Sequence, residues 1–324
     1  MKILVIKLSS IGDIFHALPA VHSLKENLGA NIDWVVHREY MDVIKCFPDV
    51  QRVIPFFRDS FFSNFALFLR ELRREEYDYI IDLQGLLKSA MVAYLARGKE
   101  IIGPSFHREG AGIIYSRIAG QRNKHRHAVD ECMDVAELLC DKSTVPLKVE
   151  FPVQFPESKI TGGHPKVAML PVSRWETKNW PAKCYVEVIR RLKTLKEIEF
   201  FLIGGPDDRA VCEGIIRDAG AGVNMAGKLS LIETGSLLKE MDLLIANDSG
   251  PMHMAVALDV PVLAIYGPTD PVRTGPYGSL NRIAKTSLDC QPCFSRTCRR
   301  DGIPCLSGVT PENVIEMALE MLKK

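Results

Sequence analysis

A short polar turn near residue 250 is the part of the sequence with the most evident chemistry. It joins an apolar, strand-like stretch to a following helix, whose first backbone N–H groups have no partners inside the helix. Such a helix start is a natural place for an anion to bind, so the turn predicts a site for a phosphorylated ligand. The alternative is that Asp248 and Ser249 merely cap the helix. The turn consists of Asp248, Ser249, Gly250, Pro251, Met252 and His253.

Two other polar loops are expected beside this turn, because each also follows an apolar, strand-like stretch. Residues 267–270 follow the stretch 262–266, and residues 171–181 follow the stretch 166–170. Open parallel sheets bind ligands where such loops meet, at the carboxyl ends of their strands. Lys178 in the second of these loops can neutralise a diphosphate leaving group, although many lone lysines are only solvated.

The sequence contains no Asp-x-Asp, the motif with which many sugar-transferring enzymes anchor a metal-bound nucleotide diphosphate. If the ligand is a sugar nucleotide, the positive charge must therefore come from the protein. Lys178, the helix after Asp248 and the imidazole of His253 are the candidates for stabilising a departing diphosphate without Mg²⁺. We expect no catalytic metal and no required cofactor.

A carboxylate near the N-terminus is the candidate general base. Asp13 follows the strand-like stretch 2–8, and Gly12 before it allows a tight turn into the next helix. The start of that helix favours the ionised carboxylate, which can accept a proton from a hydroxyl that attacks a substrate. As an alternative, Asp13 is only a charge at a helix end.

Four of the nine cysteines are clustered near the C-terminus with the spacing C-x2-C-x4-C-x6-C. This spacing is compatible with a tetrahedral structural zinc, although the usual pair of C-x2-C motifs is missing. A stable disulfide is disfavoured in a reducing cytosol. We expect a structural role, with or without metal, for Cys290, Cys293, Cys298 and Cys305.

Strand-like and helix-like stretches alternate along both halves of the chain and predict a mostly parallel α/β sheet in each. Residues 144–163, with three prolines and a Gly-Gly pair, are typical of a linker. The expected architecture is two Rossmann-like domains, residues 1–155 and 156–324, that face one another across a cleft. Neither domain contains G-x-G-x-x-G or G-x4-G-K-[ST], which disfavours a dinucleotide cofactor and a P-loop nucleotidase.

The overall composition is that of a globular protein outside the membrane. The 324 residues carry a formal net charge of +1, which gives no general attraction to nucleic acid. No apolar run approaches the roughly 20 residues of a membrane span, and no signal peptide is recognisable. We expect a cytoplasmic protein, with surface contact at a membrane left open.

Six motifs in order along the chain resemble the ADP-heptose:lipopolysaccharide heptosyltransferases of glycosyltransferase family 9. The second motif is most similar to heptosyltransferase I. The resemblance implies a GT-B fold with an N-terminal acceptor domain and a C-terminal ADP-sugar domain, and metal-independent transfer with inversion. The motifs are K-L-S-S-I-G-D-I-F-H-A-L-P from Lys7, D-L-Q-G-L-L-K-S from Asp82, S-R-x3-K-x-W-P from Ser173, G-K-L-S-L from Gly227, N-D-S-G-P-M-H from Asn247 and Y-G-P-T-D from Tyr266.

The resemblance also implies roles for individual residues. Asp13 would be the general base, Ser173 and Lys178 would contact the diphosphate, and Leu229 would lie against adenine. An acidic residue near the ribose would be one of the pair Asp207 and Asp208. Ser249 stands where members often have threonine, and the loop from Ser173 to Lys178 is one residue longer than is typical. The nucleotide-sugar turn would be formed by Asp248, Ser249, Gly250 and His253.

The implied acceptor is the Kdo-containing inner core of lipopolysaccharide, an anionic glycolipid. A basic segment, residues 107–127, suits its carboxylates and phosphates, and a solvated basic face is the alternative. Phe56, Phe57 or Phe62 would contact acyl chains if they are not part of the core. The C-terminal helix is expected to pack back on the N-terminal domain.

Other functions fit the same two-domain pattern. Within the class, heptosyltransferases II and III and transferases for other nucleotide sugars are alternatives. From other classes, a nucleotide-sugar epimerase and a non-catalytic ADP-sugar-binding protein remain.

Overall fold

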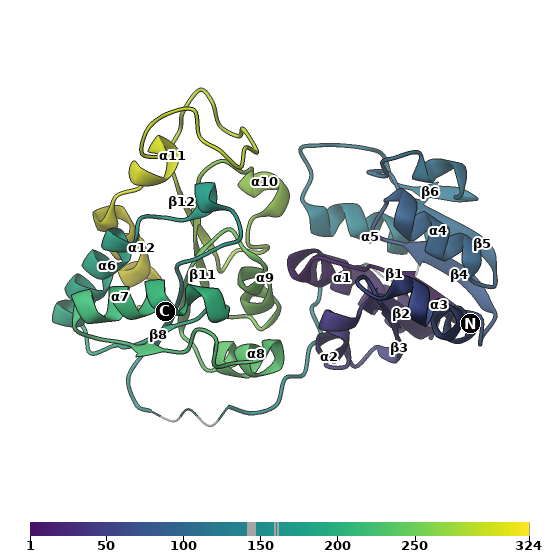
Figure 1. Ribbon diagram of the computed structural model, residues 1–324, viewed down its shortest axis with the longest axis horizontal. Helices are drawn as coiled ribbons and strands as arrows, with labels where there is room; N and C mark the ends of the chain where they lie inside the picture. Colours follow the sequence, from purple (N-terminus) through teal and green to yellow (C-terminus); the bar gives the residue numbers. More distant parts are fainter. Residues whose placement is uncertain (141–146, 159, 161, 324) are drawn as a thin grey trace. The chain divides into compact units, whose positions relative to one another are not determined.

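Strands and helices alternate along both halves of the chain, as the sequence predicts (Figure 1). The computed structural model describes residues 1–140, 147–158, 160 and 162–323. Contacts divide the chain into two units, Met1–Gln154 and Phe155–Lys324. Each unit contains one six-stranded sheet of parallel strands. The predicted α/β class is therefore confirmed in both units.

The sheet of the first unit has the strand order β3-β2-β1-β4-β5-β6. The order reverses between β1 and β4, and parallel sheets bind ligands at such a reversal. The loop that follows β1 leads into α1, whose first turn carries Asp13. The elements are β1 (Lys2–Ile6), α1 (Ile11–Leu28), β2 (Asn31–His37), η1 (Arg38–Tyr40), α2 (Met41–Ile44), β3 (Val50–Phe56), α3 (Phe61–Leu72), β4 (Tyr77–Asp82), α4 (Leu87–Leu95), β5 (Gly98–Pro104), η2 (Ala111–Ile113), β6 (Arg117–Ala119) and α5 (Ala128–Leu139).

The second unit repeats this topology, with the strand order β12-β11-β10-β7-β8-β9. Its reversal lies between β7 and β10, which pair in parallel from Val167 with Leu243 to Leu170 with Ala246. The elements are β7 (Lys166–Leu170), η3 (Glu176–Lys178), α6 (Ala182–Leu195), β8 (Glu199–Leu202), η4 (Pro206–Asp208), α7 (Arg209–Ala219), β9 (Val223–Asn224), α8 (Leu231–Lys239), β10 (Leu243–Asn247), α9 (Gly250–Ala257), β11 (Val262–Tyr266), α10 (Pro271–Thr274), β12 (Arg282–Lys285), α11 (Pro304–Ser307) and α12 (Pro311–Met321).

The central strands β7, β10 and β11 of the second sheet are buried along their whole length, because helices cover both faces of the sheet. All five residues of β10 and all five of β11 are buried. Their continuous apolar sequences are the reason that the two strands could be predicted from the sequence. In contrast, the edge strands β6, β9 and β12 are short, and they carry polar and exposed residues that hide them from such a prediction.

The C-terminal helix α12 packs within the second unit. Its apolar residues, including Val314, Ile315 and Ala318, belong to the core of the second unit. There α12 packs against α6 and against the strands β11 and β12. Its packing on the N-terminal domain stays a prediction.

The predicted linker contains no helix or strand at residues 147–158, and its first residues, 144–146, lie outside the described part. Residues 148–154 are attached to the first unit. Ser23 Oγ donates a hydrogen bond to Lys148 O at 3.4 Å, and Gln154 N donates to Cys46 O at 2.8 Å. No helix in the described part of the chain is both long and apolar enough to cross a membrane.

Candidate functional site

An ion pair joins two of the predicted loops in the second unit. Lys178 Nζ lies 2.6 Å from Asp248 Oδ2, and the hydroxyl of Thr269 donates to the same oxygen at 2.7 Å. The three residues come from the loops after β7, β10 and β11. The Asp248 carboxylate is buried, where charges interact more strongly than in bulk water. The predicted convergence of these loops is therefore present.

Asn247 holds the turn in place and was not among the predicted site residues. It is fully buried at the end of β10. Its Nδ2 donates to Pro171 O at 2.6 Å, and its Oδ1 accepts from Trp180 N at 3.2 Å and from Tyr185 Oη at 3.1 Å. An asparagine at the end of an otherwise apolar strand is the sequence signal for this role, since a buried amide needs partners.

The start of α9 has the features of an anion site. Ser249 is the residue before the helix, in extended conformation, and Gly250 is the first helical residue. The Ser249 Oγ is buried and has no hydrogen-bond partner among the described residues. A buried hydroxyl without a partner is uncommon, and here it stands beside the N–H of Gly250 at a helix start, where Pro251 has no N–H and Met252 N donates to Ser249 O at 3.2 Å. His253 lies buried on the same helix, one turn further on.

Ser173 makes several hydrogen bonds within its own loop. Its backbone N–H donates to Asn179 Oδ1 at 2.7 Å, and its hydroxyl lies 2.9 Å from that oxygen and 3.0 Å from Trp175 O. These contacts shape the loop that carries Lys178. A hydroxyl has one proton to donate, and the Ser173 hydroxyl donates it within the loop. To donate to a ligand, the hydroxyl would have to rotate away from its partner in the loop; otherwise it can only accept. Its contact with a diphosphate stays a prediction.

The loop of Leu229 lies against the loop of the two candidate aspartates. Gly227 N donates to Gly204 O at 3.0 Å, and a Cβ on Gly227 would lie 2.8 Å from Pro206 Cα. Leu229 is partly exposed, as a residue that contacts a base should be.

The two candidate aspartates near the ribose differ in their contacts. Asp208 accepts a hydrogen bond from Gly205 N at 2.7 Å, whereas Asp207 is exposed. Asp207 makes no hydrogen bond among the residues that the structure describes, so its carboxylate is the more available of the two.

Asp13 occupies the first turn of α1 in the first unit and is half-buried. Its Oδ2 accepts hydrogen bonds from Ser10 N at 2.9 Å and from Ser10 Oγ at 2.7 Å. Its Oδ1 makes no hydrogen bond in the part of the chain that the structure describes. Asp13 thus caps the helix with one oxygen and leaves the other free to accept a proton.

A second loop of the first unit supports the loop of Asp13. Gln84 Oε1 accepts from the backbone N–H groups of Leu8 and Ser9, at 3.1 Å each. The loop of Gln84 is held in turn by Asp82, which is fully buried and accepts from Gln84 N at 2.8 Å and from Tyr115 Oη at 2.7 Å. Burial raises the pKa of Asp82, and the hydrogen bonds to its carboxylate oppose this rise.

Positive side chains gather near the same strand ends. Burial and the nearby charges of Lys88 and Arg58 lower the pKa of His37. Burial and Arg58 likewise lower the pKa of Lys88, whose Nζ lies 5.4 Å from the ring centroid of Phe56. Neighbouring positive charges lower one another's pKa, and a bound anion would reduce this repulsion. His37, Arg58 and Lys88, here called the basic cluster, are therefore a candidate site for an anionic group.

The basic segment predicted at residues 107–127 is less available than the sequence indicates. Arg126 pairs with Asp134 at 2.8 Å, and Arg117 pairs with Glu100 at 3.3 Å. These partners depend on tertiary packing and could not be predicted from the local charge of the sequence.

The predicted contact of Phe56 with acyl chains is wrong. Phe56 is buried against Phe68, at 5.3 Å between ring centroids, and cannot reach acyl chains.

The four clustered cysteines line one small pocket of about 30 Å³. Cys305 is buried, and burial raises the pKa of its thiol, with a further rise from the other three cysteines. The backbone N–H of Cys293 donates to Pro268 O at 3.0 Å, which attaches the segment to the loop after β11. The sulfurs are gathered, but no three of them lie within 4.8 Å of one another in the described structure.

Comparisons with known proteins agree with the resemblance. The model for glycosyltransferase family 9 (heptosyltransferase) matches residues 65–303. Lipopolysaccharide heptosyltransferase 1 of Pseudomonas aeruginosa is 28% identical over 99% of this chain and 98% of that protein. Two solved structures of E. coli heptosyltransferase WaaC are each 25% identical to this chain. The structure with ADP has a TM-score of 0.81, and the match covers 99% of this chain and 100% of that chain. The structure with ADP-2-deoxy-2-fluoro heptose has a TM-score of 0.78, and the match covers 99% of each chain.

These matches confirm the predicted GT-B fold class and the class of enzyme. The family model alone spans well over half of the sequence, including both candidate loops after β10 and β11. The chain belongs to glycosyltransferase family 9, the heptosyltransferases.

Proposed function

We propose that the protein transfers heptose from ADP-heptose to the Kdo-containing inner core of lipopolysaccharide, with inversion and without a metal. The relatives named lipopolysaccharide heptosyltransferase 1 and the related structure with an ADP-heptose analogue support this substrate pair. The observation that carries the proposal is the buried pair of Lys178 and Asp248 beside the unpartnered Ser249 at the start of α9.

The diphosphate of the donor binds at this turn. Lys178 has three N–H donors, of which Asp248 takes one, so two remain for phosphate oxygens. The Ser249 hydroxyl and the backbone N–H of Gly250 complete the set of donors, and His253 lies on the same helix. Donors that are already in place stabilise the charge of the leaving diphosphate without reorganisation.

The nucleoside part of the donor extends toward the neighbouring loops. Leu229 packs against adenine, and Asp207 accepts hydrogen bonds from the ribose hydroxyls. Asp207 is favoured over Asp208 because the latter already accepts from Gly205 N.

The acceptor is activated by Asp13. Its free Oδ1 takes the proton of the acceptor hydroxyl while the hydroxyl oxygen bonds to the anomeric carbon. The bond from that carbon to the diphosphate oxygen breaks, and ADP leaves with the electron pair. The basic cluster binds an anionic group of the acceptor and so holds the hydroxyl in position.

Two secondary features belong to the same proposal. The four cysteines have a structural role in residues 290–305, with or without a metal, which their shared pocket supports. The protein works in the cytoplasm and contacts the inner membrane peripherally. Exposed apolar residues of the first unit support such contact, namely Phe62, Leu87, Met91, Tyr94 and Ile113.

The test is an assay of the purified protein with a panel of nucleotide sugars, with and without a Kdo-lipid A acceptor. We expect heptosylated product and ADP only when ADP-heptose and acceptor are both present, and undiminished activity in excess EDTA assayed promptly. Conversion of the nucleotide sugar in the absence of acceptor would indicate an epimerase. Binding of ADP-heptose without any reaction would indicate a non-catalytic sensor. An absolute requirement for Mg²⁺ would contradict the proposed handling of the diphosphate.

A further inference from the structure

A histidine of the first unit lies between two carboxylates, far along α1 from Asp13. His22 Nδ1 is 2.8 Å from Asp49 Oδ2, and His22 Nε2 is 3.3 Å from Glu150 Oε2. Asp49 lies in the turn before β3, and Glu150 lies in the segment that leads to the second unit. Three separate parts of the chain thus meet at one imidazole.

A neutral imidazole cannot satisfy both carboxylates. It carries one N–H donor and one lone pair, so one of the two carboxylates must face the lone pair of a ring nitrogen. That contact is repulsive unless a cation lies between the two atoms. No lysine or arginine of the described chain pairs with Asp49 or Glu150, so the cation is either a second proton on the ring or a bound ion.

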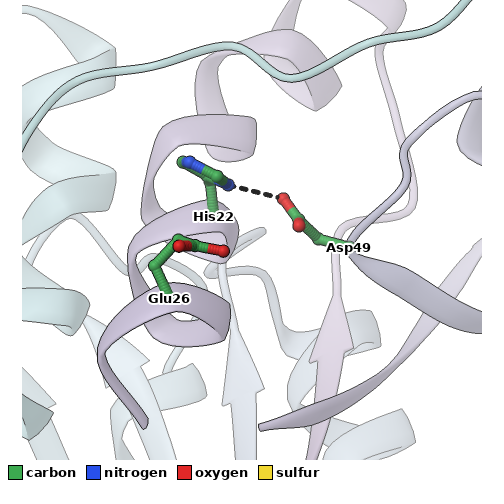
Figure 2. A group of neighbouring side chains, drawn as sticks. All are labelled: His22, Glu26 and Asp49. Atoms are coloured by element: carbon green, nitrogen blue, oxygen red, sulfur yellow. Dashed lines mark hydrogen bonds and ion pairs between the residues drawn. The ribbon is translucent and has the colours of Figure 1, made fainter. Parts of the chain in front are cut away.

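A third carboxylate completes the geometry. Glu26 follows His22 by one turn of α1 and therefore projects from the same face of the helix. Figure 2 shows its carboxylate next to His22 and on the side of Asp49. One donor atom from each of His22, Glu26 and Asp49 lies within 4.8 Å of the others. Ligands 2.0–2.2 Å from a zinc ion are about 3.3 Å apart, so small side-chain rotations suffice to close this set.

We propose that His22 Nδ1, Glu26 and Asp49 form a site for a divalent transition metal such as Zn²⁺. Glu150 accepts the hydrogen bond of the Nε2–H and thereby fixes the tautomer in which Nδ1 can bind the metal, the usual arrangement for a histidine ligand. The imidazole selects against Mg²⁺, which prefers oxygen ligands alone. The metal joins α1 to the turn before β3 and holds residues near Glu150 against α1.

This site is independent of the proposed sugar transfer. His22 lies nine residues after Asp13, or about 13 Å along the helix axis. None of its residues belongs to the proposed donor site or to the basic cluster. Failure of the metal site would therefore leave the proposed function untouched, and the reverse also holds.

The experiment is equilibrium dialysis of the full-length protein against Zn²⁺, with the bound metal measured in wild type and variants. Glu26→Gln removes one ligand at an exposed position and should not disturb the fold. Glu76→Gln is the matched control, since Glu76 is an exposed carboxylate of the same unit outside the cluster. Any zinc bound by the cysteines is the same in all these proteins, so the difference between them reports this site.

We expect Glu26→Gln and His22→Gln each to lose about one equivalent of bound zinc, and Glu76→Gln to match wild type. Glu150→Gln should bind at this site about 10 to 100 times more weakly, because it changes only the support of the histidine. Zn²⁺ should raise the melting temperature of wild type more than that of Glu26→Gln, and Mg²⁺ should not compete. Equal zinc binding by wild type, Glu26→Gln and His22→Gln would overturn the proposal, and would leave a proton as the cation at His22.

Discussion

Lys178 and Asp248 form a buried ion pair, 2.6 Å between Nζ and Oδ2, although 69 residues separate them in the sequence. The pair exists because β7 and β10 are neighbours at the reversal of strand order, so the loops that follow them meet. Thr269 adds a third loop through its bond to the same carboxylate oxygen. An ammonium group is thus held at the start of α9 before any ligand binds.

Replacing Lys178 with methionine should weaken both the fold and the reaction. The Asp248 carboxylate would remain buried without its ammonium partner, although Thr269 still donates to it, at a cost of about 1–3 kcal/mol in the free energy of unfolding. Loss of a preorganised donor to the leaving group should lower kcat by about 10²- to 10³-fold. Denaturant unfolding and steady-state kinetics measure the two effects.

The double variant Lys178→Met with Asp248→Asn separates the two effects. It removes the unpaired charge, so stability should recover while kcat stays low. Recovery of both would show that Lys178 acts only as the partner of Asp248.

Ser249→Ala should impair donor binding without impairing the fold. The hydroxyl makes no hydrogen bond in the described structure, so its removal breaks no contact within the protein. A hydrogen bond to a charged group contributes about 1.5–3 kcal/mol, which corresponds to a rise of at least about tenfold in the Kd for ADP. Calorimetric titration with ADP and thermal unfolding are the measurements.

Ser249→Thr is the matched control, because it keeps the hydroxyl. Its Kd for ADP should stay close to that of wild type. A wild-type Kd in Ser249→Ala would remove this hydroxyl from the donor site.

The titration of His37 should report the occupancy of the basic cluster. Lys88 and Arg58 lower its pKa, so Lys88→Met should raise it, and so should an anion bound at the cluster. Because the folded-state pKa lies below the unfolded value, the stability from neutral His37 is present above about pH 6.5 and is lost as pH falls through the folded pKa. NMR titration of the His37 ring measures the shift.

The variant Lys88→Met also tests how the free energy of unfolding depends on pH. Lys88→Met should lose less stability than wild type as pH falls below about 6.5. An unchanged His37 pKa, both in Lys88→Met and after addition of a Kdo-containing acceptor, would show that the three residues are not one cluster.

The sequence was sufficient for the features that depend on local pattern. Buried strands such as β1 and β10 read as continuous apolar runs, and the turn at Asp248 followed from its small polar residues and the helix after it. The loops of Asp13 and Lys178 could be assigned because parallel strands end at one edge of a sheet.

Features that depend on distant partners could not be predicted in this way. The amide of Asn247, the support of Leu8 and Ser9 by Gln84, and the grouping of His37 with Lys88 each join segments far apart in the chain. The burial of Phe56 also depends on Phe68 in a different element. Composition and spacing carry no information on such pairs until the sheet is assembled.

The central claim is that Asp13 removes the proton from the acceptor while ADP binds elsewhere, and the most direct test is the kinetics of Asp13→Asn. Asparagine keeps the carbonyl oxygen that caps α1 through Ser10, so the fold should persist. We predict that kcat for heptose transfer falls by at least about 10²-fold, while the Kd for ADP changes less than about twofold. A near-normal kcat, or an equal loss of rate, ADP binding and melting temperature, would contradict the account and return Asp13 to the role of a helix cap.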